Sequence, residues 1–431
     1  MRCICSRLRR FIGLVLIAAL ALSVWGCNTL KPKDAAASDR PRVTNPNISD
    51  ADLAALVGGD TEFAFDLYQA LSSEASGNLF YSPHSISLAL AMTYAGARGE
   101  TEEQMAQTLR FHLAQDALHK AFNGLDQELA SRGKGAAGKD SKGFRLNIVN
   151  AIWGQQDFHW APAFLDTLAE NYGAGIRLVD YVKDPERCRV TINDWVSKQT
   201  EGRIKDLIAK GMIDRLTRLV LTNAIYFNAA WQFPFDKDAT ADGSWHLLDG
   251  GKATVPMMSL TENLGYASGD GYQAVELPYD GGELSMVVLL PDSGRFDEFE
   301  GRLDAALLGE ILEQTGSERL SLTMPKFKFE SEFGLGDTLA QMGMPIAFSG
   351  AADFSAMTGV RDLYISEVVH KAFVAVDEAG TEAAAATAVI MRLTAMPAEP
   401  RVVSIDRPFV FLIRDIETGA VLFVGRVLNP S

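Results

Sequence analysis

The hydrophobic positions of this chain change between helical and strand spacing along its length, which predicts a fold that mixes helices with strands. Residues 53–71 place leucine and phenylalanine at roughly helical spacing, and Ser49 precedes them where a helix cap is expected. Residues 85–97 are small or apolar on nearly every face, which is typical of a helix that is buried on all sides. Helices are also expected at residues 111–131 and 185–200.

Runs of β-branched and aromatic residues predict strands between these helices. The last part of the chain, from Pro408 onward, is expected to form a hairpin that turns at residues 417–419. The other expected strands are residues 78–81, 144–153, 219–227, 272–277, 284–290, 320–329 and 364–376.

The first 26 residues differ from the rest of the chain, because a basic front precedes an apolar run at residues 11–24. That order is typical of a secretory signal, and the run is shorter than the ~20 residues that a membrane-spanning helix needs. Residues 24–27 (VWGC) resemble a bacterial lipobox, although Trp25 stands where a small residue is usual. We therefore expect a lipoprotein-type signal peptide over residues 1–26 and lipid attachment at Cys27.

Export with a lipid anchor predicts a location at the cell envelope, with the membrane as one partner. Asn28, the residue after the lipidated cysteine, favours the outer membrane or the cell surface. Residues 27–47 are rich in Lys, Pro, Ala, Ser and Asp, so we expect a flexible tether there. Because Cys3 and Cys5 leave with the signal, only Cys188 remains in the body of the protein, and no disulfide framework is expected.

Composition and motifs argue against several classes of function. The 431 residues are 47% hydrophobic and 22% charged, which suits a folded globular protein with a sizeable core. A net charge of −15 is unfavourable for binding nucleic acid or an anionic membrane surface. The sequence has no GxSxG, HExxH or CxxC motif, and its six histidines lack metal-site spacing. We expect no enzymatic activity, no cofactor, no metal and no nucleic-acid partner.

Residues 132–145 form a basic, glycine-rich stretch that contains a literal GxGxxG at residues 133–138. No strand precedes it and no βαβ unit surrounds it, which argues against a dinucleotide site. We expect a solvated loop, and a polyanion-binding site is the alternative. Its basic side chains would be Arg132, Lys134, Lys139, Lys142 and Arg145.

The sequence DEAGTEAAAAT at residues 377–387 has an unusual pattern of small side chains. In a strand, alternate side chains share a face, and Glu382 would point away from the small ones. Such a face could enter between two existing strands, and Gly380 before it offers the permissive backbone of a hinge. An alanine-rich linker or a surface helix is the alternative that composition alone supports. The small face would consist of Thr381, Ala383, Ala385 and Thr387.

Several segments resemble the serpin family of serine protease inhibitors. Residues 378–387 (EAGTEAAAAT) closely resemble the hinge of inhibitory serpins. Residues 77–105 (GNLFYSPHSISLALAMTYAGARGETEEQM) resemble the segment that leads from a buried strand into a central helix. FPFD at residues 233–236 and the chain end from Pro408 are also similar to the family.

The resemblance implies an α+β serpin fold with three β-sheets, surrounding helices and an exposed reactive-centre loop at about residues 378–402. Residues 48–431 would form a single serpin domain. The hinge of the loop would consist of Glu378, Gly380, Thr381, Ala383, Ala385 and Thr387.

The resemblance also assigns a sheet-opening region. Ser82 and Ser85 match serines under the middle of the main sheet, and Asn223 with His370 matches a polar pair beneath its centre. Trp231 matches the tryptophan beneath the point where the loop first enters. The simpler roles of these residue types are helix capping, hydrogen bonding and core packing.

Serpins offer the loop to a protease as a substrate, form an acyl-enzyme and trap it by inserting the loop into the sheet. We therefore expect a monomeric inhibitor of serine-type endopeptidases, with cysteine-type enzymes as a further class. A non-inhibitory serpin that serves as a binding or surface protein is the alternative.

The family spacing from Glu378 places the reactive bond between Thr394 and Ala395, which favours elastase-like or broadly specific proteases. The alternative residues for the bond are Arg392, which would imply trypsin-like targets, Leu393 and Met396.

Overall fold

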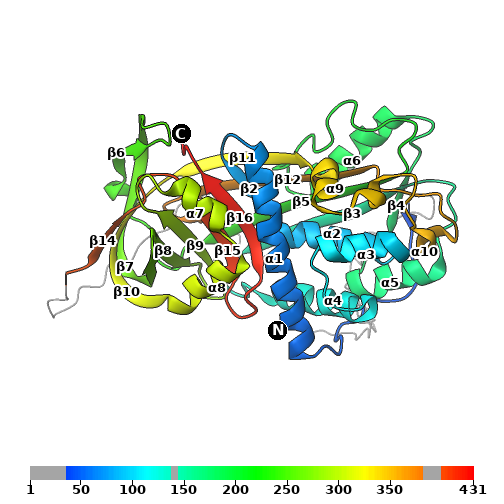
Figure 1. The fold of residues 1–431 in the computed structure, drawn as a ribbon, viewed down its shortest axis with the longest axis horizontal. Coiled ribbons are helices and arrows are strands. Elements are labelled where there is room, and N and C mark those ends of the chain that lie inside the picture. The colour runs from blue at the N-terminus through cyan, green and yellow to red at the C-terminus, as the bar shows by residue number, and fades with distance from the viewer. Residues whose placement is uncertain (1–34, 137–143, 382–398) are drawn as a thin grey trace, which may run out of the picture.

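A computed structural model describes residues 35–136, 144–381 and 399–431, and its strands form two hydrogen-bonded sheets (Figure 1). The first is a seven-stranded sheet in the order β1-β4-β3-β5-β13-β12-β11. Its strands are β1 (Ala35–Ala36), β3 (Arg145–Gln155), β4 (Ile176–Val179), β5 (Leu219–Ala230), β11 (Phe327–Gly334), β12 (Glu367–Asp377) and β13 (Gly380–Thr381).

The second is a nine-stranded sheet in the order β14-β10-β7-β8-β9-β15-β16-β2, with β6 paired to β7. Its strands are β2 (Leu79–Tyr81), β6 (Ala241–His246), β7 (Lys252–Gly269), β8 (Tyr272–Pro278), β9 (Leu284–Pro291), β10 (Gly316–Pro325), β14 (Arg401–Ser404), β15 (Phe409–Asp415) and β16 (Val421–Val427). The expected hairpin at the chain end is the β15–β16 pair.

The sheet arrangement differs from the expectation in two respects. Three sheets were expected, but the 18-residue strand β7 pairs with β6 and β10 along one part and with β8 at its end, which joins two of them. The single strand expected at residues 320–329 is two strands, because the chain leaves the nine-stranded sheet after β10 and enters the seven-stranded sheet as β11. Lys326 stands alone between them.

The helices surround the two sheets (Figure 1). The Ser49 hydroxyl accepts a hydrogen bond of 3.1 Å from the Asp52 N–H and caps the first helix, as its sequence predicts. Residues 111–114 precede α4 rather than belonging to a helix. The helices are α1 (Asp50–Glu74), α2 (Pro83–Tyr94), α3 (Gly99–Thr108), α4 (Gln115–Ser131), α5 (Pro162–Tyr172), α6 (Pro185–Gln199), α7 (Phe296–Arg302), α8 (Ala305–Gln314), α9 (Gly336–Met342) and α10 (Ser355–Thr358), with 3₁₀ turns η1 (Lys237–Ala239) and η2 (Pro345–Phe348).

Helices cover both faces of the seven-stranded sheet. Every residue of α2 is buried, and this helix packs against β3, β5 and β16, between the two sheets. On the other face, Cys188 and Ile192 of α6 pack on Trp153 and Val220 of the sheet. A strand that entered the sheet would therefore meet a close-packed interior on the α2 side.

Residues 35–47 lie against the domain, which differs from the flexible tether expected for this part of the chain. Strand β1 pairs antiparallel with β4. Ser38 Oγ donates to Asp166 at 2.5 Å, Arg40 pairs with Glu170 at 2.6 Å, and Arg42 pairs with Asp126 at 2.6 Å. Composition indicated little to bury, and the segment is in fact held by polar pairs to α4 and α5. We call residues 35–48 the N-terminal strap.

Candidate functional site

Strands β5 and β12 are neighbours at one end of the seven-stranded sheet and are separated by β13 at the other end. From Glu367 to Ala372, β12 pairs directly with β5 in parallel. Further along, Gly380 pairs with Ala230, and Thr381 pairs with Val376 of β12. Gly380 and Thr381 of the expected hinge are therefore already strand residues between β5 and β12. We call this end of the β5–β12 pair the fork.

Two aromatic side chains form the floor of the fork. The rings of Trp231 and Tyr279 stack with centroids 4.7 Å apart. Trp231 donates two hydrogen bonds of 3.0 Å to the incoming chain, from Nε1 to the Asp377 carbonyl and from its backbone N–H to the Ala379 carbonyl. Tyr279 Oη lies 2.8 Å from Thr381 Oγ1, and Thr381 is only 2% exposed. The structure thus places Trp231 where the chain enters the sheet.

Glu378 fixes the entrance of the fork through its carboxylate, which is almost fully buried. Oε1 accepts hydrogen bonds from Thr240 Oγ1 at 2.8 Å and from Lys326 Nζ at 3.0 Å, and Oε2 lies 2.9 Å from the same Nζ. Burial by itself raises the pKa of Glu378, but the hydrogen bonds from Lys326, its own backbone and Thr240 outweigh burial and lower the pKa. The carboxylate is therefore ionised at neutral pH.

Gly380 occupies a backbone position that requires glycine. Its φ is +147°, and a Cβ built there would lie 2.2 Å from the Ala229 carbonyl oxygen. The hinge glycine is thus needed for the close approach of the chain to β5.

A second cluster holds β5 to β12 directly, and we call it the latch: Ser82, Ser85, Asn150, Asn223 and His370. Asn150, Asn223 and His370 are cross-strand partners in one row of β3, β5 and β12. His370 Nδ1 lies 2.5 Å from Asn223 Oδ1. Asn223 Nδ2 donates to Ser85 Oγ and to Asn150 Oδ1, both at 2.7 Å.

The latch also reaches the nine-stranded sheet. Ser82 caps α2, its N–H donates to His370 Nε2 at 3.2 Å, and its hydroxyl donates to the Leu422 carbonyl of β16 at 2.6 Å. Because Nε2 accepts a hydrogen bond, the proton of the neutral ring lies on Nδ1 and is donated to Asn223. Burial lowers the pKa of His370 to about 3, so the ring is neutral at pH 7. His370 therefore forms hydrogen bonds to Asn223 and Ser82 and joins the segments that carry them.

Sequence reasoning did not select Asn150, which completes the latch from β3. The signal was present, because Asn150-Ala151-Ile152 repeats the triplet Asn223-Ala224-Ile225 of the neighbouring strand. A polar amide at the same place in two apolar strands favours a cross-strand pair in one buried row.

Many of the sequence-selected residues lie outside the described part of the chain. They are Cys27, Glu382, Ala383, Ala385, Thr387, Arg392, Leu393, Thr394, Ala395 and Met396.

The alternative of a polyanion site on residues 132–145 is weakened at Arg132, which is buried rather than solvated. Its Nε lies 2.7 Å from Asp415 Oδ1, and its NH1 lies within 3.1 Å of Glu128 and 3.0 Å of Glu417. Arg132 therefore ties α4 to the β15–β16 hairpin. Lys139 and Lys142 lie outside the described residues.

The described residues offer little reactive chemistry. They contain no group of three or more His, Cys, Asp or Glu side chains suited to a metal ion. Burial raises the pKa of the Cys188 thiol to about 11, which makes it a poor nucleophile. Within residues 35–136, 144–381 and 399–431, no helix has the length and apolarity to cross a membrane.

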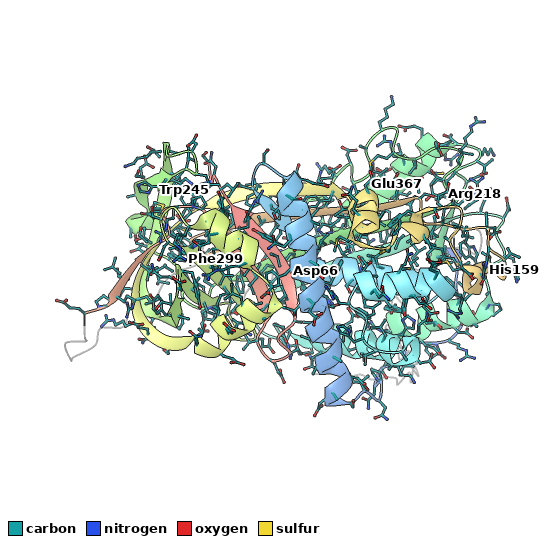
Figure 2. The ribbon with its side chains drawn as sticks, in the orientation of Figure 1. Asp66, His159, Arg218, Trp245, Phe299 and Glu367 are labelled. Carbon is teal, nitrogen blue, oxygen red and sulfur yellow. The ribbon has the colours of Figure 1, made fainter. Side chains whose placement is uncertain are left out.

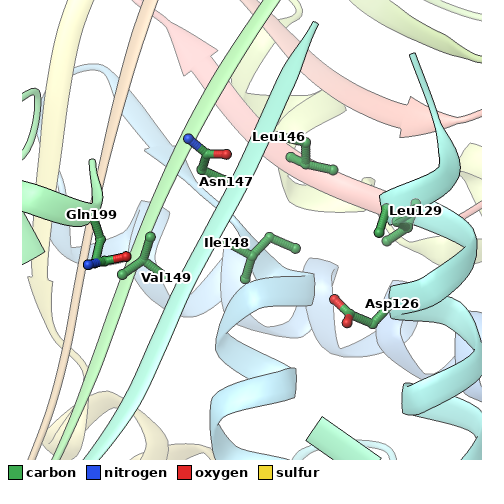
Figure 3. A pocket seen from close by; sticks show the side chains of 8 residues that line it. Asp126, Leu129, Leu146, Asn147, Ile148, Val149 and Gln199 are labelled. Carbon is green, nitrogen blue, oxygen red and sulfur yellow. The ribbon is translucent and has the colours of Figure 1, made fainter. Parts of the chain in front are cut away.

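A hollow of about 420 Å³ lies between part of β3 and α4, and none of the residues that line it belongs to the fork or the latch. Figure 3 shows Leu146 and Ile148 pointing toward Leu129 and Asp126 of α4, whereas Val149 points the other way. The packing of α4 on this half of β3 is therefore incomplete.

Comparisons with known proteins assign most of the chain to one family. The family model described as Serpin (serine protease inhibitor) matches residues 59–430. An uncharacterised serpin-like protein of Thermococcus kodakarensis is 40% identical over 378 residues, which cover 87% of this chain and 86% of the relative. Human leukocyte elastase inhibitor is 40% identical over 387 residues, which cover 87% of this chain and 99% of the relative.

Comparison with solved structures indicates the same family. The structure of tengpin, a thermophilic serpin in its native state, has a TM-score of 0.80 at 30% identity, and the match covers 92% of this chain and 100% of tengpin. The α+β fold, the family match and the relatives at 40% identity together establish that this chain belongs to the serpin family.

Proposed function

We propose that the protein inhibits proteases by inserting its own cleaved loop between β5 and β12. One observation carries the proposal: Gly380 and Thr381 already pair with both strands at the fork. A loop that begins as a strand between two others needs only to continue in the same register.

Strand direction supplies a driving force for insertion. Strand β12 runs parallel to β5, whereas β13 is antiparallel to both of them. Continuing β13 would replace one parallel ladder by two antiparallel ladders. Antiparallel pairing is slightly more stable per residue, and the number of paired strands rises as well. The native state in this account is therefore metastable with respect to the inserted one.

The observed register predicts where each inserted residue would go. In that state, each residue after Gly380 moves one position back along β5 from Ala230. Residue 387 would then stand between Asn223 and His370 and replace their direct hydrogen bond. The side chains of residues 383, 385 and 387 would share the face of Thr381, which points at Tyr279 in the close-packed interior. Small side chains on that face keep the cost of entry low.

The same register predicts the fate of the bound protease. Residue 390 would reach Val220, near the far end of β5, so a reactive bond at Thr394–Ala395 would lie beyond the sheet. An acyl-enzyme attached there would be carried from the fork to the opposite end of the sheet. Insertion has to precede hydrolysis of the ester for the protease to remain trapped.

We infer serine proteases of the elastase-like type as targets. Two considerations support this: Thr394 is a small side chain at the bond given by hinge spacing, and the similar human protein is named leukocyte elastase inhibitor. Cleavage at Arg392 would shift the target class to trypsin-like enzymes, and cleavage at Leu393 or Met396 would shift it to enzymes that accept larger apolar side chains.

We further propose that the mature protein begins at Cys27, carries lipid there and resides at the cell envelope. The support is the order of the basic front, the apolar run and the VWGC sequence in residues 1–27. Intact-mass measurement of the membrane fraction tests it, because lipidation adds the mass of the acyl groups to a chain that starts at residue 27.

The test of inhibition is incubation with an elastase-like serine protease, followed by electrophoresis in SDS and mass spectrometry of the released peptide. We expect a complex that survives boiling in detergent and a peptide that begins at Ala395. Cleavage with no stable complex would contradict inhibition and support the non-inhibitory alternative.

A further inference from the structure

The described part of the N-terminal strap begins at the end of the seven-stranded sheet that lies farthest from the fork. Ala35 pairs with Arg177, and one row continues from there through Trp153 and Val220 to Glu367. Val220 is ten residues from Ala230, the β5 residue at the fork, which is about 33 Å along a strand.

Strand β1 points away from the fork when it is followed from Ala36 to Ala35. Ala36 pairs with Ile176 and Ala35 with Arg177, so the N-terminal end of β1 points toward Val179, where β4 ends. The polar contacts of the strap with α4 and α5 hold it in this direction.

Three turns project from the same end of the sheet, and each has an exposed apolar side chain. The ends of neighbouring strands are hydrogen-bonded there, because the Gln155 N–H donates to the Arg218 carbonyl and the Ser366 N–H donates to the Leu219 carbonyl. Figure 2 shows Arg218 and His159 at this end, opposite Trp245. The apolar side chains are Val182, Leu216 and Val360, which are 46%, 69% and 55% exposed.

Each of these apolar side chains has a basic neighbour in the sequence, namely Lys183, Arg215 or Arg361. An aspartate (Asp184, Asp214 or Asp362) also lies within two residues of each, and Arg361 is paired with Asp353 at 2.6 Å. An exposed apolar tip beside a long basic side chain suits the boundary between acyl chains and phosphate headgroups. The three turns follow β4, precede β5 and precede β12, so they come from parts of the chain that only the sheet brings together.

We propose that this end of the domain is a membrane-docking face, formed by the turns at Val182, Leu216 and Val360, whose partner is the phospholipid bilayer. The proposal rests on the lipid attachment at Cys27 proposed above, and it does not need protease trapping. Seven residues lie between Cys27 and Ala35, and the eight steps from one Cα to the next reach at most about 28 Å when fully extended. The strap therefore keeps this end close to the bilayer and presents the fork away from it.

The docking face is also the end of the sheet to which an inserted loop would carry its protease. If both proposals hold, a captured protease occupies the space between the domain and the bilayer. Capture should then lift the docking face from the membrane, and this consequence rests on the proposed function.

The test attaches the chain that begins at Cys27 to vesicles of phosphatidylcholine through a maleimide lipid. Cys188 should not compete for the maleimide, because it is buried. A fluorescent coumarin amino acid replaces either Leu216 or Val402, and a quencher is carried on the lipid headgroups. Val402 is the matched control, since it is 77% exposed and lies on β14, at the opposite side of the molecule in Figure 1.

We expect quenching at position 216 to exceed quenching at position 402 by at least about threefold. A strap variant, Arg40→Ala with Arg42→Ala, should reduce that ratio toward one, whereas Arg401→Ala, which removes an exposed ion pair of β14, should leave it unchanged. Equal quenching at the two positions, or stronger quenching at 402, would overturn the docking face.

The two proposals fail separately. A stable protease complex in solution together with equal quenching on vesicles would overturn the docking face alone. Preferential quenching at 216 in a chain that traps no protease would overturn inhibition alone. If both hold, adding the protease should lower the quenching at 216.

Discussion

The fork and the latch lie in the same pair of strands and hold it in opposite ways. At the fork, β13 already separates β5 from β12, Trp231 donates hydrogen bonds to the incoming chain, and Lys326 and Thr240 hold Glu378 of that chain. At the latch, β5 and β12 are direct neighbours, and the side chains of Asn223 and His370 join them. At one end, β13 fills the space between the two strands, and at the other end the two strands pair directly.

This difference indicates a direction for the conformational change. Extension from the fork adds backbone hydrogen bonds one residue at a time, whereas the latch must release side-chain bonds worth roughly 1 kcal/mol each. The latch therefore acts as a barrier that the advancing strand meets after about six further residues, at the row of Asn223. Mutations at the two ends should have different consequences.

The largest effect is expected from Thr381→Arg at the fork. Thr381 is buried beside Tyr279, and an unpaired charge there costs several kcal/mol. The variant should be cleaved as a substrate, with the SDS-stable complex falling at least about tenfold on a gel. Thr381→Ser keeps the hydroxyl and is the matched control. A complex of normal yield with Thr381→Arg would contradict entry of the loop at the fork.

A smaller effect is expected when the charge of Glu378 is reversed. Glu378→Lys removes the pair with Lys326 and places two cations together, which should lower the free energy of unfolding by about 2–3 kcal/mol, with allowance for the partly exposed Lys326. Urea unfolding measures the change. Glu378→Gln keeps an acceptor for Thr240 without the charge and should lose less. Equal losses in the two variants would assign the effect to shape rather than charge.

The latch should respond to pH through His370. Its folded pKa of about 3 lies below the ordinary value of 6.5, so the unfolded chain binds the proton more readily. The contribution of His370 to stability is complete above about pH 6.5 and is lost as pH falls toward 3, with a slope that approaches about 1.4 kcal/mol per pH unit. Buried His119, whose pKa is lowered to about 4, acts in the same direction.

The comparison of wild type with His370→Gln isolates the latch from His119. Urea midpoints measured from pH 7 to pH 5 should fall less steeply in the variant. This window lies above the range in which Glu378, whose pKa is lowered, takes up its proton. Identical slopes in both proteins would mean that His370 is not held neutral by the closed sheet.

The smallest effect is expected from Thr240→Val at the edge of the fork. It removes one of the hydrogen bonds to Glu378 and leaves the ion pair with Lys326, so we expect a loss of about 0.5–1 kcal/mol in urea unfolding. Thr61→Val is a matched control, since the Thr61 hydroxyl donates only to a backbone carbonyl within its own helix, α1. That helix is far from Thr240 in the sequence. A loss as large as that of Glu378→Lys would show that the hydroxyl, rather than the charge, fixes the entrance.

Much of the fold follows from local sequence patterns. The cap at Ser49, the fully buried helix α2 and the terminal hairpin were all predicted, because capping, apolar faces and turn residues act within a few positions of one another. The division of residues 320–329 between two sheets was not predicted. An uninterrupted β pattern does not reveal that the chain changes partners at Lys326.

The candidate site was predicted only in part for the same reason. Trp231, Asn223 and His370 were selected through the family resemblance, and the structure shows what each contacts. Tyr279 and Asn150 were missed, since their contacts with Thr381 and Asn223 join segments far apart in sequence. The sequence predicts a flexible tether where the strap lies, because ion pairs such as Arg42–Asp126 leave no hydrophobic pattern.

The most direct test of the central claim is the melting temperature of the protein before and after its loop is cut between residues 382 and 398, in the same buffer. If the cut loop extends β13 between β5 and β12, new ladders form on both sides of it, and the melting temperature should rise by at least about 10 °C. An unchanged or lower melting temperature, with cleavage verified by mass spectrometry, would contradict insertion of the loop into the sheet.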